Sequence, residues 1–194
     1  SGQVIDRYPS YSPAGRRLAC ASARRGPEEI WIRDLETRRQ ERLQLPGKDL
    51  GVSLPYWLAD GQKLTVTRFF PDGTRSLWLA AADGSHAEEL RPKAPGVSGS
   101  RISPDGRRVL YLARTGGFLQ LFALDLASRE QRQLTRSRSD KYEGAWSPDG
   151  RRLAFLHEAE LHVLPLESSR PPRRLTADLL EGGAEFDDRL MEQY

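Results

Sequence analysis

The stretch Trp146-Ser-Pro-Asp-Gly150 occurs in four versions along the chain. The other three are Tyr11-Ser-Pro-Ala-Gly15, Trp57-Leu-Ala-Asp-Gly61 and Ile102-Ser-Pro-Asp-Gly106. From 15 to 61, from 61 to 106 and from 106 to 150 the closing glycines lie 46, 45 and 44 residues apart. A period of roughly 40–50 residues with several short strands is typical of a β-propeller blade. The spacing therefore predicts an all-β chain with four propeller repeats.

The fourth repeat shows the expected order of strands within one blade. Residues 143–146 form a short first strand, and the Asp-Gly turn that follows supplies the residues that a tight hairpin needs. Residues 152–156 and 161–164 are apolar on both faces, as expected of strands in stacked sheets. An outer strand follows near residues 173–176. Each repeat is thus predicted to be a four-stranded antiparallel blade, and the tryptophans are expected to pack between blades; these are Trp31, Trp57, Trp78 and Trp146.

The repeats fill most of residues 1–194 as a single propeller segment. Their expected bounds are about 8–45, 54–91, 99–135 and 143–176. Residues 177–194 are a tail or the start of a fifth blade, because 182–187 resembles 143–146; a short helix from 186 is the alternative. Four blades is the lower limit of closed propellers. We therefore expect an incomplete ring, or one that a homo-oligomer completes through its open blade edges.

Composition narrows the class of partner. The chain has 30 Lys and Arg, 27 Asp and Glu, a net charge of +3 and a mean hydropathy of −0.63. It lacks an apolar run of the ~18 residues that a membrane-spanning helix needs. Arginine doublets at 16–17, 107–108 and 151–152 follow the turns, so propeller geometry spreads this charge around a rim. We expect them to be solvated, and we expect no nucleic-acid partner, which favours a concentrated basic stripe.

The residues that could carry chemistry form no persuasive active site. Gly96-Val97-Ser98-Gly99 has the wrong spacing for a nucleophile elbow. His157 and His162, with Glu158 and Glu160, flank one hairpin and could share a metal, but their place in a blade hairpin favours surface polar residues. The expectation is no catalytic residue, no metal and no cofactor, and therefore no enzyme activity.

The single cysteine, Cys20, excludes an internal disulfide and any multi-cysteine metal site. It stands in an apolar strand pattern, where a thiol behaves as a small apolar side chain. Buried packing is therefore expected for Cys20.

Two segments of the chain resemble the TolB-like (WD40-like) propeller repeat. They are Trp146–Phe155 with Leu175-Thr176, and Ile102–Tyr111 with Leu134-Thr135. The resemblance covers about residues 8–176. It departs from the pattern at Ala14, where the family favours Asp, and at Leu58-Ala59, where it favours Ser-Pro; both affect turn stability.

The resemblance implies an interaction scaffold in one of three settings. One is the periplasmic TolB-like proteins of the bacterial Tol system, which implies a periplasmic or cell-envelope location, with the cytoplasm as alternative. Another is the noncatalytic gating propeller of serine peptidases of the prolyl-oligopeptidase-like or tricorn-like kind. The third is the sensor domain of a bacterial transcriptional regulator. The resemblance alone does not choose among them.

The segments that lead into the first strands are the candidate partner-binding site. In a propeller they lie around the central channel, where one partner reaches several blades. Two of these segments have similar sequences, each with a carboxylate, a cation and an aromatic ring, which suits a protein or peptide partner. The alternative is that the Asp and Tyr side chains fix the turns by hydrogen bonds. The candidate residues are Asp6, Arg7, Tyr8, Asp140, Lys141, Tyr142 and Glu143.

Overall fold

The computed structural model describes residues 5–47, 50–167 and 170–176. Within these ranges the strands form four antiparallel sheets, each made of four strands that are consecutive in sequence. The all-β prediction is therefore confirmed. Residues 177–194, where a tail or a fifth blade was expected, lie outside the described residues.

Each sheet is one blade, numbered here in chain order. Blade 1 contains β1 (Asp6–Tyr11), β2 (Arg17–Ser22), β3 (Glu29–Asp34) and β4 (Gln40–Arg42). Blade 2 contains β5 (Gly51–Trp57), β6 (Lys63–Phe69), β7 (Arg75–Ala81) and β8 (Ala87–Ala94). Blade 3 contains β9 (Ser98–Ile102), β10 (Arg108–Thr115), β11 (Phe118–Asp125) and β12 (Gln131–Gln133). Blade 4 contains β13 (Lys141–Trp146), β14 (Arg152–His157), β15 (Glu160–Pro165) and β16 (Arg173–Arg174).

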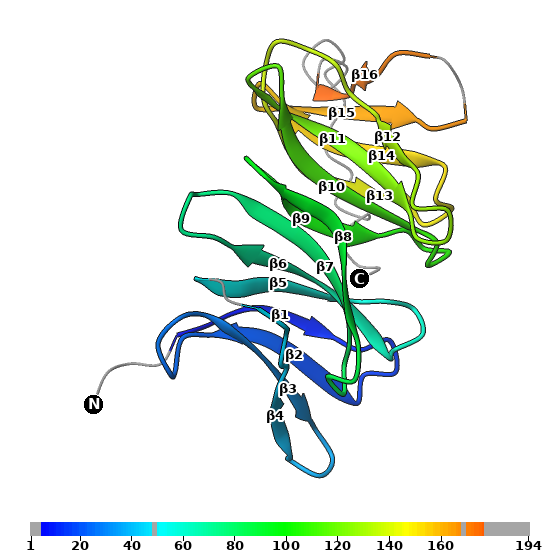
Figure 1. Cartoon of the computed structure of the whole chain (residues 1–194). Helices are drawn as coiled ribbons and strands as arrows, with labels where there is room; N and C mark the ends of the chain where they lie inside the picture. Colours follow the sequence, from blue (N-terminus) through cyan, green and yellow to red (C-terminus); the bar gives the residue numbers. More distant parts are fainter. Residues whose placement is uncertain (1–4, 48–49, 168–169, 177–194) are drawn as a thin grey trace.

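The first strand of every blade lies at the inner edge of the arc. β1 contacts β5, β5 contacts β9, and β9 contacts β13, so these four strands converge. The inner strands of blades 2, 3 and 4 also lie against the preceding sheet; β13, for example, contacts β10 and β11. Figure 1 shows the blades as successive wedges, with blade 1 and blade 4 at opposite ends. The four described blades therefore form an open arc.

The apolar core lies between the sheets rather than inside any one of them. Alternate residues of a strand point to opposite faces, so each inner blade presents one apolar face to each neighbour. In blade 1, Ala19 and Ala21 of β2 and Ile30 and Ile32 of β3 are buried against blade 2. Two further clusters fill the joints between blades 2 and 3 and between blades 3 and 4.

The recurring turn connects the first and second strands of each blade. Its closing glycines have φ values of 72° at Gly15, 63° at Gly61, 71° at Gly106 and 67° at Gly150, in the left-handed region that favours glycine. The glycine N–H donates to the carbonyl three residues earlier, as from Gly150 to Ser147 at 2.8 Å. The repeated sequence is thus a repeated backbone conformation.

Candidate partner-binding site

Each inner strand carries a β-bulge seven residues before the turn glycine. The residues there are Tyr8, Leu54, Gly99 and Glu143, with φ values of 53°, 56°, 67° and 43°. The pairing of first and second strands shifts register at this point in every blade. Bulges re-aim side chains, and a non-glycine residue at positive φ is strained. Because only one of the four is glycine, the sequence gives no sign of this feature.

In blade 1, the predicted site residues lie on β1. Tyr8 is 45 % exposed, and Asp6 and Arg7 are also exposed. Both Asp6 carboxylate oxygens lie 3.1 Å from Arg24 Nη2. A hydrogen bond from Ser22, together with the Arg24 guanidinium, lowers the pKa of Asp6. β1 therefore presents an aromatic ring beside a charged pair.

In blade 4, the exposed site residues are Tyr142 and Glu143. Tyr142 is 50 % exposed, and its hydroxyl donates to Asp140 Oδ2 at 3.3 Å. Asp140 Oδ1 accepts a hydrogen bond from Leu119 N at 2.7 Å, so this carboxylate also joins blade 4 to blade 3. Asp140 therefore ties the connection before β13 to β11 of blade 3, and its second oxygen orients the exposed Tyr142 ring.

Lys141 is only 2 % exposed, unlike its neighbours. Its Nζ donates to Ser137 Oγ at 2.5 Å and to Ser139 O at 2.9 Å. Burial lowers the pKa of Lys141. Gln120 Nε2 also donates to the carbonyls of Ser137 and Ser139, at 3.0 and 3.1 Å. Lys141 therefore fastens the 136–140 connection from beneath and lies below the exposed surface.

The two predicted stretches correspond in the fold with an offset of one residue. Asp6 pairs with Ser22 and Lys141 with His157, and both partners stand seven residues after their turn glycine. Asp6 is therefore equivalent to Lys141, and Tyr8 to Glu143. The stretches lie on the two end blades, with β5 and β9 between them (Figure 1). The structure does not bring them into contact.

His157 and His162 lie partly buried on the side of blade 4 that faces blade 3, which corrects their interpretation as surface residues. Their ring centroids are 5.0 Å apart, and His162 stacks on Phe155 at 5.6 Å. His157 Nε2 lies 2.5 Å from Ser139 Oγ. Burial, then the neighbouring His157, lowers the pKa of His162. In the described part of the chain, no group of three or more His, Cys, Asp or Glu is placed to hold a metal.

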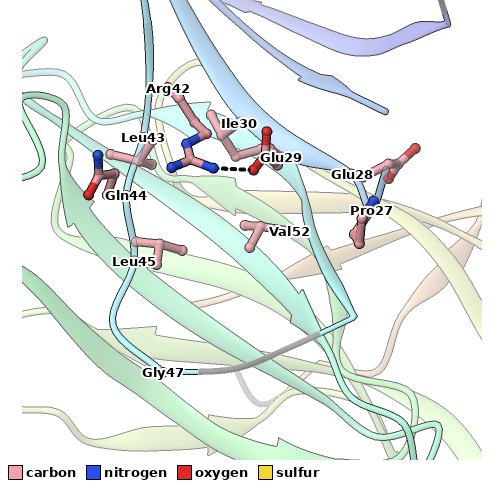
Figure 2. A pocket seen from close by; sticks show the side chains of 10 residues that line it. All are labelled: Pro27, Glu28, Glu29, Ile30, Arg42, Leu43, Gln44, Leu45, Gly47 and Val52. Atoms are coloured by element: carbon pink, nitrogen blue, oxygen red, sulfur yellow. Dashed lines mark hydrogen bonds and ion pairs between the residues drawn. The ribbon is translucent and has the colours of Figure 1, made fainter. Parts of the chain in front are cut away.

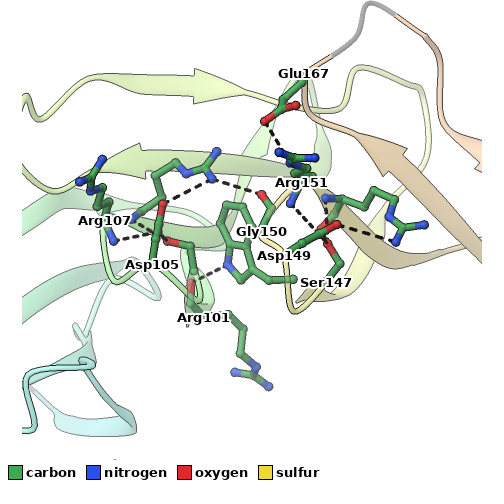
Figure 3. A network of polar contacts seen from close by, with 12 residues as sticks. Arg101, Asp105, Arg107, Ser147, Asp149, Gly150, Arg151 and Glu167 are labelled. Carbon is green, nitrogen blue, oxygen red and sulfur yellow. Dashed lines mark hydrogen bonds and ion pairs between the residues drawn. The ribbon is translucent and has the colours of Figure 1, made fainter.

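The second arginine of two doublets is only partly exposed and packs on a tryptophan, contrary to the sequence-based expectation of fully solvated side chains. Arg108 Cζ lies 4.9 Å from the ring centroid of Trp146, and Arg108 Nη2 donates to Gly150 O at 3.2 Å. Trp146 Nε1 in turn donates to Arg101 O at 3.1 Å. Figure 3 shows this network across the joint of blades 3 and 4. We call it the arginine clamp: an arginine of one blade covers the tryptophan of the next blade and binds its turn.

The same clamp joins blades 1 and 2. Arg17 Cζ lies 4.6 Å from the Trp57 ring centroid, and Arg17 donates to Gly61 O. Trp57 Nε1 donates to Ser10 O at 3.0 Å. The first arginines of the doublets, such as Arg16, remain exposed, as expected. Trp57 and Trp146 thus pack between blades, as predicted.

Trp31 lies on the face of blade 1 away from blade 2, so its predicted place between blades is not confirmed by the described residues. Its neighbour Ile30 points the other way, into the joint. The guanidinium carbons of Arg24 and Arg25 lie 4.7 and 5.2 Å from its ring. Cys20, paired with Trp31, is partly rather than fully buried, and that burial raises the pKa of its thiol.

A cavity of about 280 Å³ lies beside β3 and β4 and also borders Val52 near the start of β5 (Figure 2). Ile30, Leu43 and Val52 contribute apolar walls. Glu29 Oε1 lies 2.6 Å from Arg42 Nη1. This ion pair occupies the polar side of the cavity, and none of the candidate partner-binding residues lines it.

Wedge-shaped four-stranded sheets that stack face to face around converging inner strands define a β-propeller. Residues 103–186 match the family described as the dipeptidyl peptidase IV (DPP IV) N-terminal region. The chain is 30 % identical over 155 residues to the uncharacterized peptidase YuxL of Bacillus subtilis, covering 79 % of this chain and 22 % of that protein. It is 29 % identical over 128 residues to the protein TolB homolog of Chlorobium luteolum, covering 66 % of this chain and 28 % of that protein.

Among solved structures, TolB from Acinetobacter baumannii superposes with a TM-score of 0.72 at 18 % identity, covering 89 % of this chain and 43 % of that one. The chain is a TolB-like β-propeller. It spans about a quarter of the length of the curated relatives that it matches. Within the described ranges, no helix is long and apolar enough to cross a membrane.

Proposed function

We propose that the chain is a noncatalytic scaffold that binds a protein or peptide partner through its inner strands. The observation that carries this proposal is the pair of half-exposed rings, Tyr8 at 45 % and Tyr142 at 50 %, each placed at or beside a bulge. Tyrosines are enriched among the residues that dominate binding energy at interfaces. The charged side chains beside them are Asp6, Arg7 and Glu143, and buried Lys141 positions the blade 4 group.

A propeller site of this kind reaches its partner from several blades at once. The four bulges recur at one level of the inner edge, so a bound peptide would meet one bulge per blade. The similarity to a TolB homolog supports a binding role and, with it, a periplasmic or cell-envelope location. Fractionation of cells that express the chain tests that location.

The experiment places a photo-crosslinking amino acid at position 8, 142 or 35. Leu35 is the matched control, because it is 40 % exposed but lies at the outer turn after β3. We expect partner adducts from positions 8 and 142 and none from 35. Tyr8→Ala and Tyr142→Ala should each weaken capture of the same partner at least fivefold. Equal adducts from all three positions would refute the inner-strand site.

A second candidate function is the gating propeller of a serine peptidase. The match of residues 103–186 to the dipeptidyl peptidase IV N-terminal region and the similarity to an uncharacterized peptidase favour it. On this alternative, the inner strands would meet substrate peptides on their way to a separate catalytic domain. Peptide hydrolysis by the complete gene product, abolished by a serine-directed inhibitor, would support this alternative over the scaffold.

A further inference from the structure

Lys141 and His157 lie opposite each other where the chain enters blade 4. Lys141 of β13 pairs with His157 of β14, and both side chains contact Ser139 of the preceding connection. Ser139 Oγ lies 2.5 Å from His157 Nε2 and 3.4 Å from Lys141 Nζ. Lys141 is 2 % exposed, and the His157 side chain is 22 % exposed. We call Lys141, Ser139 and His157 the serine bridge, because the Ser139 hydroxyl joins the other two side chains.

Hydrogen bonding in the serine bridge requires a neutral His157. The Lys141 ammonium has three donors and no acceptor, and the oxygens that accept from it are Ser137 Oγ, Ser139 O and Ser139 Oγ. Ser139 Oγ therefore donates its own proton to His157 Nε2, which accepts only in the neutral imidazole. A protonated His157 would donate to the same oxygen and stand as a second cation opposite Lys141. Because Lys141 is buried, water and salt screen this repulsion poorly.

The other charged groups of blade 4 offer a protonated histidine little compensation. His162 lies beside His157 with ring centroids 5.0 Å apart, and burial, then the neighbouring His157, lowers the pKa of His162. Glu160 Oε2 lies 4.0 Å from His162 Nε2, but Arg174 Nη1 already binds Glu160 Oε1 at 3.0 Å. Glu158 Oε1 lies 3.7 Å from His157 Nε2, and its side chain is 69 % exposed. Ion pairs with such exposed carboxylates contribute little.

Blade 3 and the connection bring further cations to the serine bridge. Arg114 of β10 places its Nη1 3.8 Å from Asp140 Oδ1, and Arg136 and Arg138 of the connection are exposed. Burial lowers the pKa of Lys141, and nearby carboxylates, among them Asp140, act in the opposite direction. The group is therefore built around one buried cation, and a second positive charge beside it is unfavourable.

The connection held by the serine bridge also orients Tyr142, one of the two half-exposed rings of the candidate site. Asp140 stands between Ser139 and Lys141 in the sequence. Its Oδ1 accepts a hydrogen bond from Leu119 N at 2.7 Å, and its Oδ2 accepts one from the Tyr142 hydroxyl at 3.3 Å. A shift of Ser139 or Lys141 therefore moves the carboxylate that orients the ring.

The equivalent place in blade 1 carries a carboxylate and a serine instead of a lysine and a histidine. Asp6 stands at the Lys141 position and Ser22 at the His157 position. A hydrogen bond from Ser22, together with the Arg24 guanidinium, lowers the pKa of Asp6, so this carboxylate keeps its charge in mild acid. Only the blade 4 half of the site is therefore expected to respond to pH values just below neutral.

We propose that the serine bridge positions Tyr142 for partner binding and that protonation of His157 releases the connection, so that the blade 4 half of the site weakens in mild acid. This regulation rests on the scaffold function proposed above. The neighbouring His162 acts in the same direction. Because its folded pKa is lowered, its neutral form contributes stability above the unfolded value of about 6.5, and that stability is lost as the pH falls towards the folded value.

Fluorine NMR tests the positioning without a partner. A 3-fluorotyrosine at position 142 or at position 8 reports the surroundings of each ring. From about pH 7 to about pH 5, the signal at position 142 should move by at least about half of the difference between the folded and the urea-unfolded chain. The signal at position 8 should move by less than about a tenth of that difference, because the carboxylate beside it keeps its charge. A constant signal at position 142 would overturn the proposal.

Two histidine variants identify the group that titrates. His157→Gln keeps an uncharged acceptor for the Ser139 hydroxyl and cannot be protonated, so it should abolish the shift at position 142. His86→Gln is the matched control and should leave the shift unchanged, because His86 is the remaining histidine and is exposed before β8. A shift that persists in His157→Gln would refute the role of His157. If that variant does not fold, Ser139→Ala decides: it should show the acid signal already at about pH 7, and a normal signal would refute the serine bridge.

Partner adducts separate this regulation from the scaffold function. A photo-crosslinking amino acid at position 143 lies beside an intact Tyr142, and position 8 is its equivalent in blade 1. Between about pH 7 and about pH 5, adducts from position 143 should fall about threefold, and those from position 8 should change less than about 1.5-fold. A fluorine shift with adducts that do not depend on pH would overturn the regulation. No adducts at either pH would refute the scaffold function itself, whatever the fluorine signal does.

Discussion

The joint between blades 3 and 4 and the joint between blades 2 and 3 connect the same kind of sheet by different means. At the first joint, Trp146 and Arg108 form an arginine clamp. At the second, Ile102 and Lys63 occupy the equivalent positions, and neither can form that contact. Instead Thr65 Oγ1 and Ser100 Oγ share a buried hydrogen bond of 2.9 Å.

The joint between blades 2 and 3, which has no clamp, has a larger apolar core than the joint between blades 3 and 4. Tyr111 is buried there and stacks on Phe122 at 5.4 Å, and Leu77, Val97 and Val109 are fully buried beside it. Burial of apolar surface is roughly additive in area and needs no particular partner. The comparison teaches that the repeat fixes which face of each blade is covered, while each joint has its own chemistry.

The largest expected effect concerns the close contact at the clamped joint. Leu110→Ala should lower the free energy of unfolding by about 2–5 kcal/mol, because it leaves a cavity between blades. Gly144→Ala alone should cost about 1–3 kcal/mol through overpacking against Leu110. The double variant should be less destabilised than the sum, because the new methyl group enters the cavity. Urea denaturation measures all three, and strict additivity would contradict the contact.

The next effect separates the two joints. Trp146→Leu should cost about 2–4 kcal/mol, since it removes the ring under Arg108 and leaves Arg101 O without its donor. Ile102→Leu, the matched change at the joint without a clamp, should cost less than about 1.5 kcal/mol. Thermal unfolding followed by circular dichroism compares the two variants. Similar losses would show that the clamp adds nothing to packing.

A smaller effect of opposite sign is expected at the bulges. Glu143→Gly should stabilise the fold by up to about 1 kcal/mol, because glycine relieves a φ of 43° at an exposed site. Gly99→Ala should destabilise by about 1 kcal/mol or more, since its φ is 67°. The bulges are equivalent, so the two changes should move the urea midpoint in opposite directions. A shift of the same sign would refute that equivalence.

The smallest effect is the pH dependence contributed by the turn at the clamped joint. A hydrogen bond from the Ser147 hydroxyl, then one from Arg151 N, lowers the pKa of Asp149. A carboxyl whose pKa is lower in the folded state adds stability above its unfolded pKa of about 3.9, and that stability is lost as the pH falls through the folded value. Asp149→Asn should therefore flatten the loss of stability below about pH 4. Urea denaturation at several pH values tests this prediction. If the free energy of unfolding of Asp149→Asn falls with acid as steeply as that of the unmodified chain, Asp149 does not contribute to the pH dependence.

Much of the fold followed from the sequence, because the turn glycines have backbone angles that few other residues adopt. Their spacing predicted four blades, and the apolar second and third strands indicated sheets covered on both faces. Those features depend on local sequence, and both are confirmed.

The candidate partner-binding site could be predicted only in part, because two segments of similar sequence need not occupy equivalent positions in their blades. Asp6 to Tyr8 and Asp140 to Glu143 read alike, yet the strand pairing offsets them by one residue. Lys141 is expected at the surface from its sequence but is buried, and the Ser137 and Ser139 oxygens that accept its hydrogen bonds belong to a loop with no recognisable sequence pattern. The four bulge positions share no residue type, because the pairing with the neighbouring strand, and not the local sequence, imposes their backbone conformation.

The clamp was within reach of sequence reasoning but was missed. An arginine two residues after one turn glycine and a tryptophan four residues before the next recur together at 17 with 57 and at 108 with 146. The arginine of one repeat therefore has to be compared with the tryptophan of the next repeat for the clamp to be predicted. The sequence also showed lysine with isoleucine at the remaining joint, where the clamp is absent.

Both arginine clamps have the same direction along the chain. In both examples the arginine is the earlier partner, 44 residues before Gly61 and 42 before Gly150. Each of the four described blades also forms its sheet from consecutive strands, and among the described residues none takes a strand from a later blade. During synthesis, each clamp arginine is therefore made before the indole ring and the carbonyl that it binds in the folded chain. A blade that folds as soon as its four strands are complete would therefore offer its arginine to the tryptophan of the next blade.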